Sequence, residues 1–170
     1  MTGTILLVED QEDDVFFLKR AFQGVGIHNP VQVVQDGKDA MDYLAGAGHY
    51  ADRERFPLPC LVLLDLKLPR VMGLEVLKWI RSQAELKTVI VLVLTSSRAP
   101  ADIARAYQLG VDALLIKPSG PEELQEIAAG IKAFWLQANT GSGRQDQMAK
   151  SSDSEDKRDL PKAFILVDRS

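Results

Sequence analysis

Residues 60–69 read Cys-Leu-Val-Leu-Leu-Asp-Leu-Lys-Leu-Pro, an apolar run that is first interrupted at Asp65. A half-buried strand alternates apolar and polar side chains, so a run that is apolar at every position indicates a strand covered on both faces. Such strands belong to parallel sheets with helices on both sides. The stretch therefore predicts a central strand with a carboxylate at its end.

Four further short apolar runs lie along the chain, and the second of them is the weakest: 4–8, 31–34, 89–94 and 113–116. Between the runs, apolar residues recur at three- and four-residue steps, as in Leu74, Leu77 and Ile80, which is typical of amphipathic helices. This alternation predicts an α/β fold with a five-stranded parallel sheet.

The overall composition limits the classes of function. Of the 170 residues 46% are hydrophobic, which is enough to bury a core, and the net charge of −4 argues against a protein that binds nucleic acid through bulk charge. The single cysteine, Cys60, excludes an internal disulfide and argues against a cysteine zinc site. We see no membrane span or signal peptide in the sequence, and therefore expect a cytoplasmic protein.

The composition changes after residue 138. Residues 139–159 are rich in Gly, Ser, Gln, Lys and Asp, which is typical of a linker or tail. We therefore expect one domain over residues 1–138 and a polar tail over 139–170. The tail ends in an apolar, β-prone segment, Ala163 to Val167. Two interpretations of this segment stay open: an unstructured end, and a strand that pairs with an exposed sheet edge of this chain or of a partner.

Four of the predicted strands are directly followed by candidate functional residues: Glu9 and Asp10, Asp65, Thr95 and Ser96, and Lys117 with Pro118. The carboxyl ends of parallel strands share one edge of the sheet, so we expect these residues to converge there. Each feature alone has an ordinary explanation, such as the capping of a helix. Their order on successive strand ends is what indicates a functional site.

Three carboxylates within a few ångströms would repel one another and raise at least one pKa. A divalent cation together with Lys117 would neutralise them. Because the ligands are all oxygen, with no His or Cys, they favour Mg²⁺. Asp65 could then act both as a metal ligand and as a nucleophile that forms an acyl phosphate.

These residues lie in motifs that resemble the receiver domain of bacterial two-component response regulators, namely Ile5-Leu-Leu-Val-Glu-Asp10, Leu64-Asp-Leu-Lys-Leu-Pro69 with Gly73, Val93-Leu-Thr-Ser96 and Ile116-Lys-Pro118. The resemblance covers about residues 3–137. It is closest to the single-domain subfamily associated with phytochrome histidine kinases, on the basis of residues 8–14, Asp36-Gly37 and the long segment 46–59 before the third strand.

The resemblance implies a flavodoxin-like, doubly wound sheet with strand order 2-1-3-4-5. It also implies that Asp65 accepts a phosphoryl group from a sensor histidine kinase, and that Thr95 and Lys117 contact the phosphoryl oxygens. The Mg²⁺ ligands would be the side chains of Glu9, Asp10 and Asp65 and the backbone carbonyl of Lys67. The Lys117–Pro118 bond would be cis.

The implied function is that of a signalling protein, not an enzyme, whose protein-binding surface changes on phosphorylation, with protein binding, homodimerisation or phosphate relay as its output. One departure from the family is Leu114, three residues before Lys117, where many receivers carry a rotating aromatic residue. Activation would therefore rely on Thr95 and the following helix. Two alternatives stay open: a phosphorylation-independent pseudo-receiver, and a phosphohydrolase. The second is disfavoured because such enzymes need an acid–base Asp where this chain has Lys67.

Overall fold

The structure, a computed structural model, describes residues 3–137 and 164–165. Most of the expected tail, 139–163 and 166–170, lies outside the described residues. The strands are β1 (Ile5–Val8), β2 (Val31–Val34), β3 (Leu61–Leu64), β4 (Ile90–Thr95), β5 (Ala113–Ile116) and β6 (Phe164–Ile165). The helices are α1 (Glu12–Gly24), α2 (Gly37–Ala45), α3 (Gly73–Ser82), α4 (Pro100–Gln108) and α5 (Pro121–Ile131), the last continued by a π-helical segment (Lys132–Gln137).

The first five strands form a parallel sheet in the order β2-β1-β3-β4-β5, which confirms the predicted fold and strand order. A sixth strand, β6, extends the sheet beyond the five that were predicted. It pairs antiparallel with β5, with Leu114 opposite Ile165 and Leu115 opposite Phe164. Of the two interpretations of the apolar tail segment, the structure therefore supports a strand on a sheet edge of the same chain.

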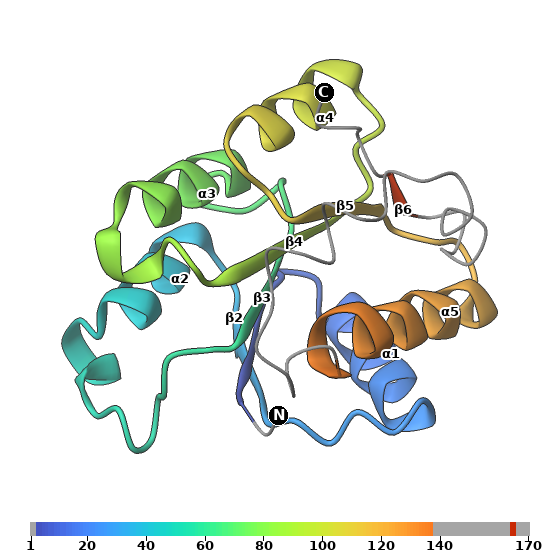
Figure 1. Cartoon of the computed structure of the whole chain (residues 1–170), viewed down its shortest axis with the longest axis horizontal. Helices are drawn as coiled ribbons and strands as arrows, with labels where there is room; N and C mark the ends of the chain where they lie inside the picture. The colour runs from blue at the N-terminus through green and yellow to red at the C-terminus, as the bar shows by residue number, and fades with distance from the viewer. Residues whose placement is uncertain (1–2, 138–163, 166–170) are drawn as a thin grey trace.

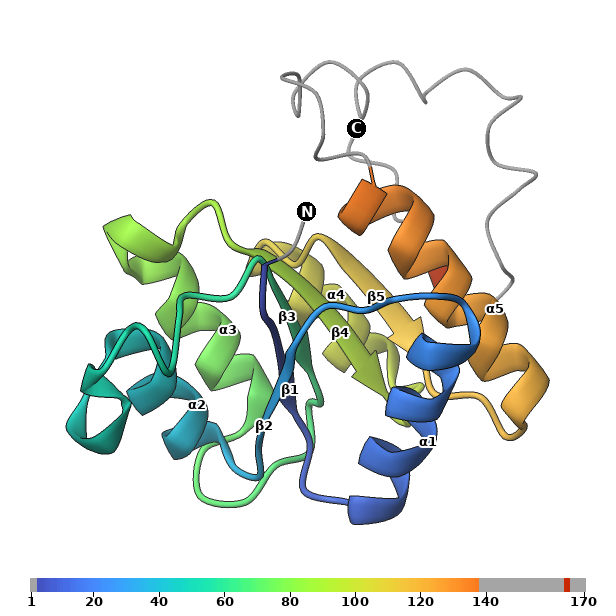
Figure 2. The same ribbon diagram turned by 90° about the horizontal axis from the view of Figure 1, so that it is seen from below.

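Helices cover both faces of the sheet, with α1 and α5 on one face and α2, α3 and α4 on the other (Figures 1 and 2). Successive side chains of a strand point to opposite faces, which explains how fully apolar strands serve both layers. In β1, for example, Ile5 and Leu7 belong to the core cluster beneath α1 and α5, whereas Leu6 and Val8 belong to the other cluster. No helix among the described residues is long and apolar enough to cross a membrane.

The segment 46–59 is held against the body of the protein rather than forming only a loop. It contains a short 3-10 helix, Gly48–Ala51. The guanidinium of Arg53 donates to the backbone oxygens of Tyr43 and Leu44, each at 2.8 Å, and so satisfies carbonyls at the end of α2. Gly46 ends that helix in the left-handed region with φ 67°, a conformation that glycine adopts without strain.

The pairing of β6 with β5 leads to a first prediction. Truncation after residue 159, or Ile165→Pro, should increase hydrogen exchange at the backbone of Ala113–Ile116, because the outer edge of β5 loses its partner. Exchange in β1 and β3, which lie inside the sheet, should not change. Exchange measured by NMR or mass spectrometry tests this, and equal protection of β5 in the full and truncated chains would contradict the pairing.

Candidate functional site

Strand order and register bring the predicted site residues to one edge of the sheet. Val8 of β1 lies opposite Leu64 of β3, so the next residues, Glu9 and Asp65, emerge side by side. Lys117 follows β5, which is separated from β3 by β4. A long side chain is therefore needed at this position to reach the carboxylates across the end of β4.

Three carboxylates form an acidic cluster at this edge. Each of Glu9, Asp10 and Asp65 places an oxygen within 4.8 Å of the others. The side chains of Glu9 and Asp65 are buried, with 4% and 7% exposed, whereas Asp10 is partly exposed. The residues that the sequence predicted to converge are therefore together, in an environment where uncompensated charge is costly.

The ammonium group of Lys117 supplies the compensating charge. Its Nζ donates to Glu9 Oε2 at 2.6 Å, to Asp14 Oδ2 at 2.9 Å and to Asp65 Oδ2 at 3.0 Å. Only 15% of the lysine side chain is exposed, so these are charge-assisted hydrogen bonds largely shielded from water. Lys117 thus links the ends of β1 and β3 with the first turn of α1.

Burial and hydrogen bonding in the site shift the pKa values of Glu9 and Lys117. Burial raises the pKa of Glu9 above its usual range, and the hydrogen bonds from Lys117 and from the Gln11 backbone only partly offset this effect. Burial of Lys117 opposes its positive charge, but its hydrogen bonds to three carboxylates outweigh the burial and raise the pKa of Lys117 above its usual range. The lysine therefore remains charged at any physiological pH.

The loop after β3 holds Asp65 in place. The amide of Lys67 donates to Asp65 Oδ1 at 3.3 Å, while Oδ2 accepts from Lys117. Gly73, at the start of α3, packs directly beneath this loop, and a Cβ at residue 73 would lie 2.1 Å from the backbone oxygen of Asp65. Only glycine permits this approach, so close packing accounts for the glycine at position 73.

Thr95 lies at the end of β4 with a fully buried side chain. Its backbone oxygen accepts from the Lys117 amide at 2.8 Å, which places it beside the site. Its hydroxyl accepts from the amide of Ser97 at 3.2 Å. Among the described residues, no hydrogen bond joins this hydroxyl to the acidic cluster, so Thr95 is near the cluster without being part of it.

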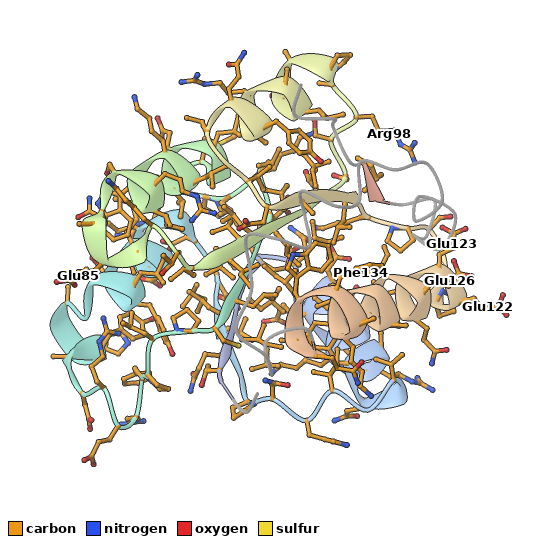
Figure 3. The ribbon with its side chains drawn as sticks, viewed as in Figure 1. Glu85, Arg98, Glu122, Glu123, Glu126 and Phe134 are labelled. Carbon is orange, nitrogen blue, oxygen red and sulfur yellow. The ribbon has the colours of Figure 1, made fainter. Side chains whose placement is uncertain are left out.

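A cavity of about 310 Å³ opens beside the site and combines charged and apolar walls. Its charged side is formed by Glu9, Asp14, Asp65 and Lys117, and its apolar side includes Phe17, Leu124 and Pro118. Further charges lie at the periphery, where Glu122, Glu123 and Glu126 project from α5 into solvent (Figure 3). Water screens these exposed carboxylates, so they add little repulsion to the buried ones.

The donor set of the cluster fits a divalent metal ion. All three side chains offer carboxylate oxygens, and no His or Cys is among them, which favours a hard cation. Asp10 is the carboxylate of the cluster that Lys117 does not contact. A cation would therefore neutralise charge that the lysine leaves uncompensated.

Two features differ from the expectations based on sequence. Asp14 was not among the predicted site residues, but it lies in the site; its position four residues after Asp10, in the acidic run 9–14, was the available signal. The expected cis bond at Lys117–Pro118 is wrong, because every described peptide bond is trans. Trans is the more stable isomer of an X–Pro bond by about 0.5–1 kcal/mol, and in this isomer Lys117 already reaches three carboxylates.

Comparison with known proteins identifies related chains. The family described as the response regulator receiver domain matches residues 5–129. The chain is 40% identical over 142 residues to the "Probable methanogenesis regulatory protein FilR2" of Methanothrix harundinacea, covering 82% of this chain and 87% of that protein. It is 37% identical to the response regulator Rcp1 of Synechocystis sp., covering 80% of this chain and 90% of that protein.

Two solved structures are similar along most of their length. The phosphorylated cyanobacterial phytochrome response regulator RcpA has a TM-score of 0.76 at 36% identity, covering 84% of this chain and all (100%) of that one. The Mn²⁺-bound form of Rcp1 has a TM-score of 0.74 at 35% identity, covering 83% of this chain and 99% of that one. The second is a relative that holds a divalent metal, in agreement with the donor set described above.

The contacts of Lys117 lead to a second prediction. Without divalent metal at pH 7, Lys117→Met should lower the free energy of unfolding by about 3 kcal/mol, because it leaves Glu9 and Asp65 buried without a cation. Lys38→Met, which removes an exposed ammonium paired with Asp42, should cost less than about 0.5 kcal/mol. Urea denaturation measures both changes, and equal effects would contradict the role of Lys117.

The same variant should show a defined pH dependence. The pKa of Glu9 is raised in the folded protein, so the associated stability is present at low pH and lost as pH rises through that pKa. Loss of Lys117 removes interactions that lower this pKa, so the pKa of Glu9 rises further. The deficit of Lys117→Met should therefore shrink as the pH is lowered, and a deficit independent of pH would contradict this assignment.

Proposed function

The chain belongs to the response regulator receiver family, and we propose that it accepts a phosphoryl group on Asp65 from the phosphohistidine of a sensor histidine kinase. Receiver-domain response regulators are signalling proteins that bind a divalent metal, not enzymes. The proposed receiver unit spans residues 1–138, and the proposed polar tail spans 139–170.

The observation that carries the proposal is the environment of Asp65. Its carboxylate is buried, is oriented by the Lys67 amide and the Lys117 ammonium, and lies next to two further carboxylates suited to a metal ion. A carboxylate that served only to cap a loop would need none of these charged neighbours. A positioned, metal-supported carboxylate can instead act as a nucleophile toward phosphorus.

In the proposed transfer, an oxygen of Asp65 forms a bond to phosphorus while the P–N bond of the phosphohistidine breaks. The imidazole departs with the bonding electron pair as a neutral ring, because its other nitrogen keeps its proton. Lys117 donates to a phosphoryl oxygen and compensates its negative charge. The product is an acyl phosphate on Asp65.

We propose Mg²⁺ as the metal, held by the side chains of Glu9, Asp10 and Asp65 and by the backbone carbonyl of Lys67. A bound divalent cation supplies Lewis-acid stabilisation of charge on the phosphoryl oxygens. The residues of the chain orient the Asp65 carboxylate and position the Lys117 ammonium.

The kinase that provides the phosphoryl group is proposed to be of the phytochrome type, since RcpA is a phytochrome response regulator. The exchange is proposed to occur in the cytoplasm, where nucleotide-dependent kinases act.

Signalling is proposed to follow from Thr95. Its hydroxyl, now bonded to the Ser97 amide, can turn and donate to a phosphoryl oxygen, which would draw the start of α4 toward the site. Residue 114 is a leucine, and a fully buried one, so a rotating aromatic at that position plays no part. The surface that would change is formed by α4, β5 and α5, through which the protein would bind a partner or a second copy.

The proposed acceptor role leads to a third prediction. Incubation with acetyl phosphate and Mg²⁺ should add the mass of one phosphoryl group to the wild-type protein but not to Asp65→Asn, whose amide is not a nucleophile. The exposed residue Asp13 provides a matched control, because Asp13→Asn makes the same chemical change outside the acidic cluster. Intact-protein mass spectrometry measures the adduct, and an adduct on Asp65→Asn would rule out the proposal.

A fourth prediction separates phosphorylation from its readout. Thr95→Val should still be phosphorylated, but the shift toward the activated state should be about tenfold weaker, since one charge-assisted hydrogen bond is lost. Thr95→Ser keeps the hydroxyl and should behave like the wild type. NMR shifts of α4 amides with beryllofluoride, a phosphoryl mimic, measure this response, and a full response of Thr95→Val would exclude Thr95 as the switch.

A further inference from the structure

We propose that Asp14 is a positioning residue that holds Lys117 in the unphosphorylated protein and is the partner displaced by an incoming phosphoryl oxygen. Asp14 would thereby oppose activation. This inference rests on the proposed function of Asp65 and assigns a regulatory role to a residue outside the acidic cluster.

The first step of the argument is the number of donors. A lysine ammonium has three N–H donors and no acceptor. All three have carboxylate partners here, namely Glu9, Asp14 and Asp65, at 2.6, 2.9 and 3.0 Å. Lys117 can therefore bind a phosphoryl oxygen only by releasing or weakening one of these bonds.

The second step is the cost of releasing each partner. The side chain of Glu9 is 4% exposed, so its release would leave an uncompensated buried charge. Asp65, 7% exposed, loses its carboxylate charge to the acyl phosphate, and its remaining carboxyl oxygen stays an acceptor for Lys117. The side chain of Asp14 is 45% exposed and can be hydrated in place of its bond to the lysine. The bond to Asp14 is therefore the least costly of the three to break.

The third step is what stabilises Asp14 after its release. Asp14 lies in the first turn of α1, where the positive end of the helix dipole favours a carboxylate. Its charge is thus supported even without Lys117. The arrangement gives Lys117 a permanent pair of buried partners and one exchangeable partner at the mouth of the cavity.

The neighbouring Asp13 provides a matched control. It lies in the same turn of α1 and contributes equally to the helix dipole, but it is exposed and makes no described bond to Lys117. A role of Asp14 as a helix-capping charge alone would be shared by Asp13. Competition for Lys117 would not be shared by Asp13, because Asp13 does not contact the lysine among the described bonds.

The test is a titration of the full chain with beryllofluoride at saturating Mg²⁺, followed by NMR. We expect Asp14→Ala to bind beryllofluoride about fivefold more tightly than the wild type, the effect of removing a partly exposed ion pair that competes for the lysine. Asp13→Ala should bind as the wild type does. Asp14→Glu, which keeps the carboxylate, should restore affinity close to that of the wild type. Asp14→Asn replaces Asp14→Ala if the latter does not fold.

The outcomes separate the two proposals. If the wild type itself does not respond to beryllofluoride, the proposed function fails. If the wild type responds but Asp14→Ala binds with equal or lower affinity, the competitive role of Asp14 is overturned. Equal tightening in Asp13→Ala and Asp14→Ala would show a general effect of charge and would also overturn it.

Discussion

The hydrogen bonds of the Lys117 ammonium are the interaction on which the rest of the site depends. They join the ends of β1 and β3 to the first turn of α1, across 108, 103 and 52 residues of sequence separation. Without this cation, two buried carboxylates would face each other in a region of low dielectric constant. The lysine therefore makes the burial of these carboxylates in the folded site tolerable.

The parallel sheet makes this arrangement possible. Because Val8 and Leu64 are paired in neighbouring strands, the residues that follow them emerge together at one edge. The close packing of Gly73 beneath the loop then keeps the Asp65 carboxylate from moving away. The site is therefore built on rigid strand ends and on one tight backbone contact, which is typical of ligand sites in open α/β sheets.

The β5 edge of the sheet is also covered within the chain. The outer edge of β5 pairs with β6, which lies in the apolar segment near the end of the chain. Edge strands with unpaired backbone groups readily pair with other chains. A short strand on this edge satisfies those groups within the chain and lies next to the surface proposed for the output. The proposed acceptor site and β6 therefore both adjoin β5, since Lys117 directly follows the strand and β6 pairs along its outer edge.

Much of the fold and of the site could be predicted because the signals are local. Runs such as 61–64 and 90–94 are apolar at every position and identify buried parallel strands, and the shared edge of such strands predicts that Glu9, Asp10, Asp65 and Lys117 meet. The sequence by itself thus determined the strands, their covering helices and the acidic cluster. Only the tertiary structure decided that Asp14 bonds to Lys117, that the Lys117–Pro118 bond is trans, and that β6 pairs with β5. These outcomes depend on distances between segments that lie tens of residues or more apart, which local periodicity and charge patterns do not specify.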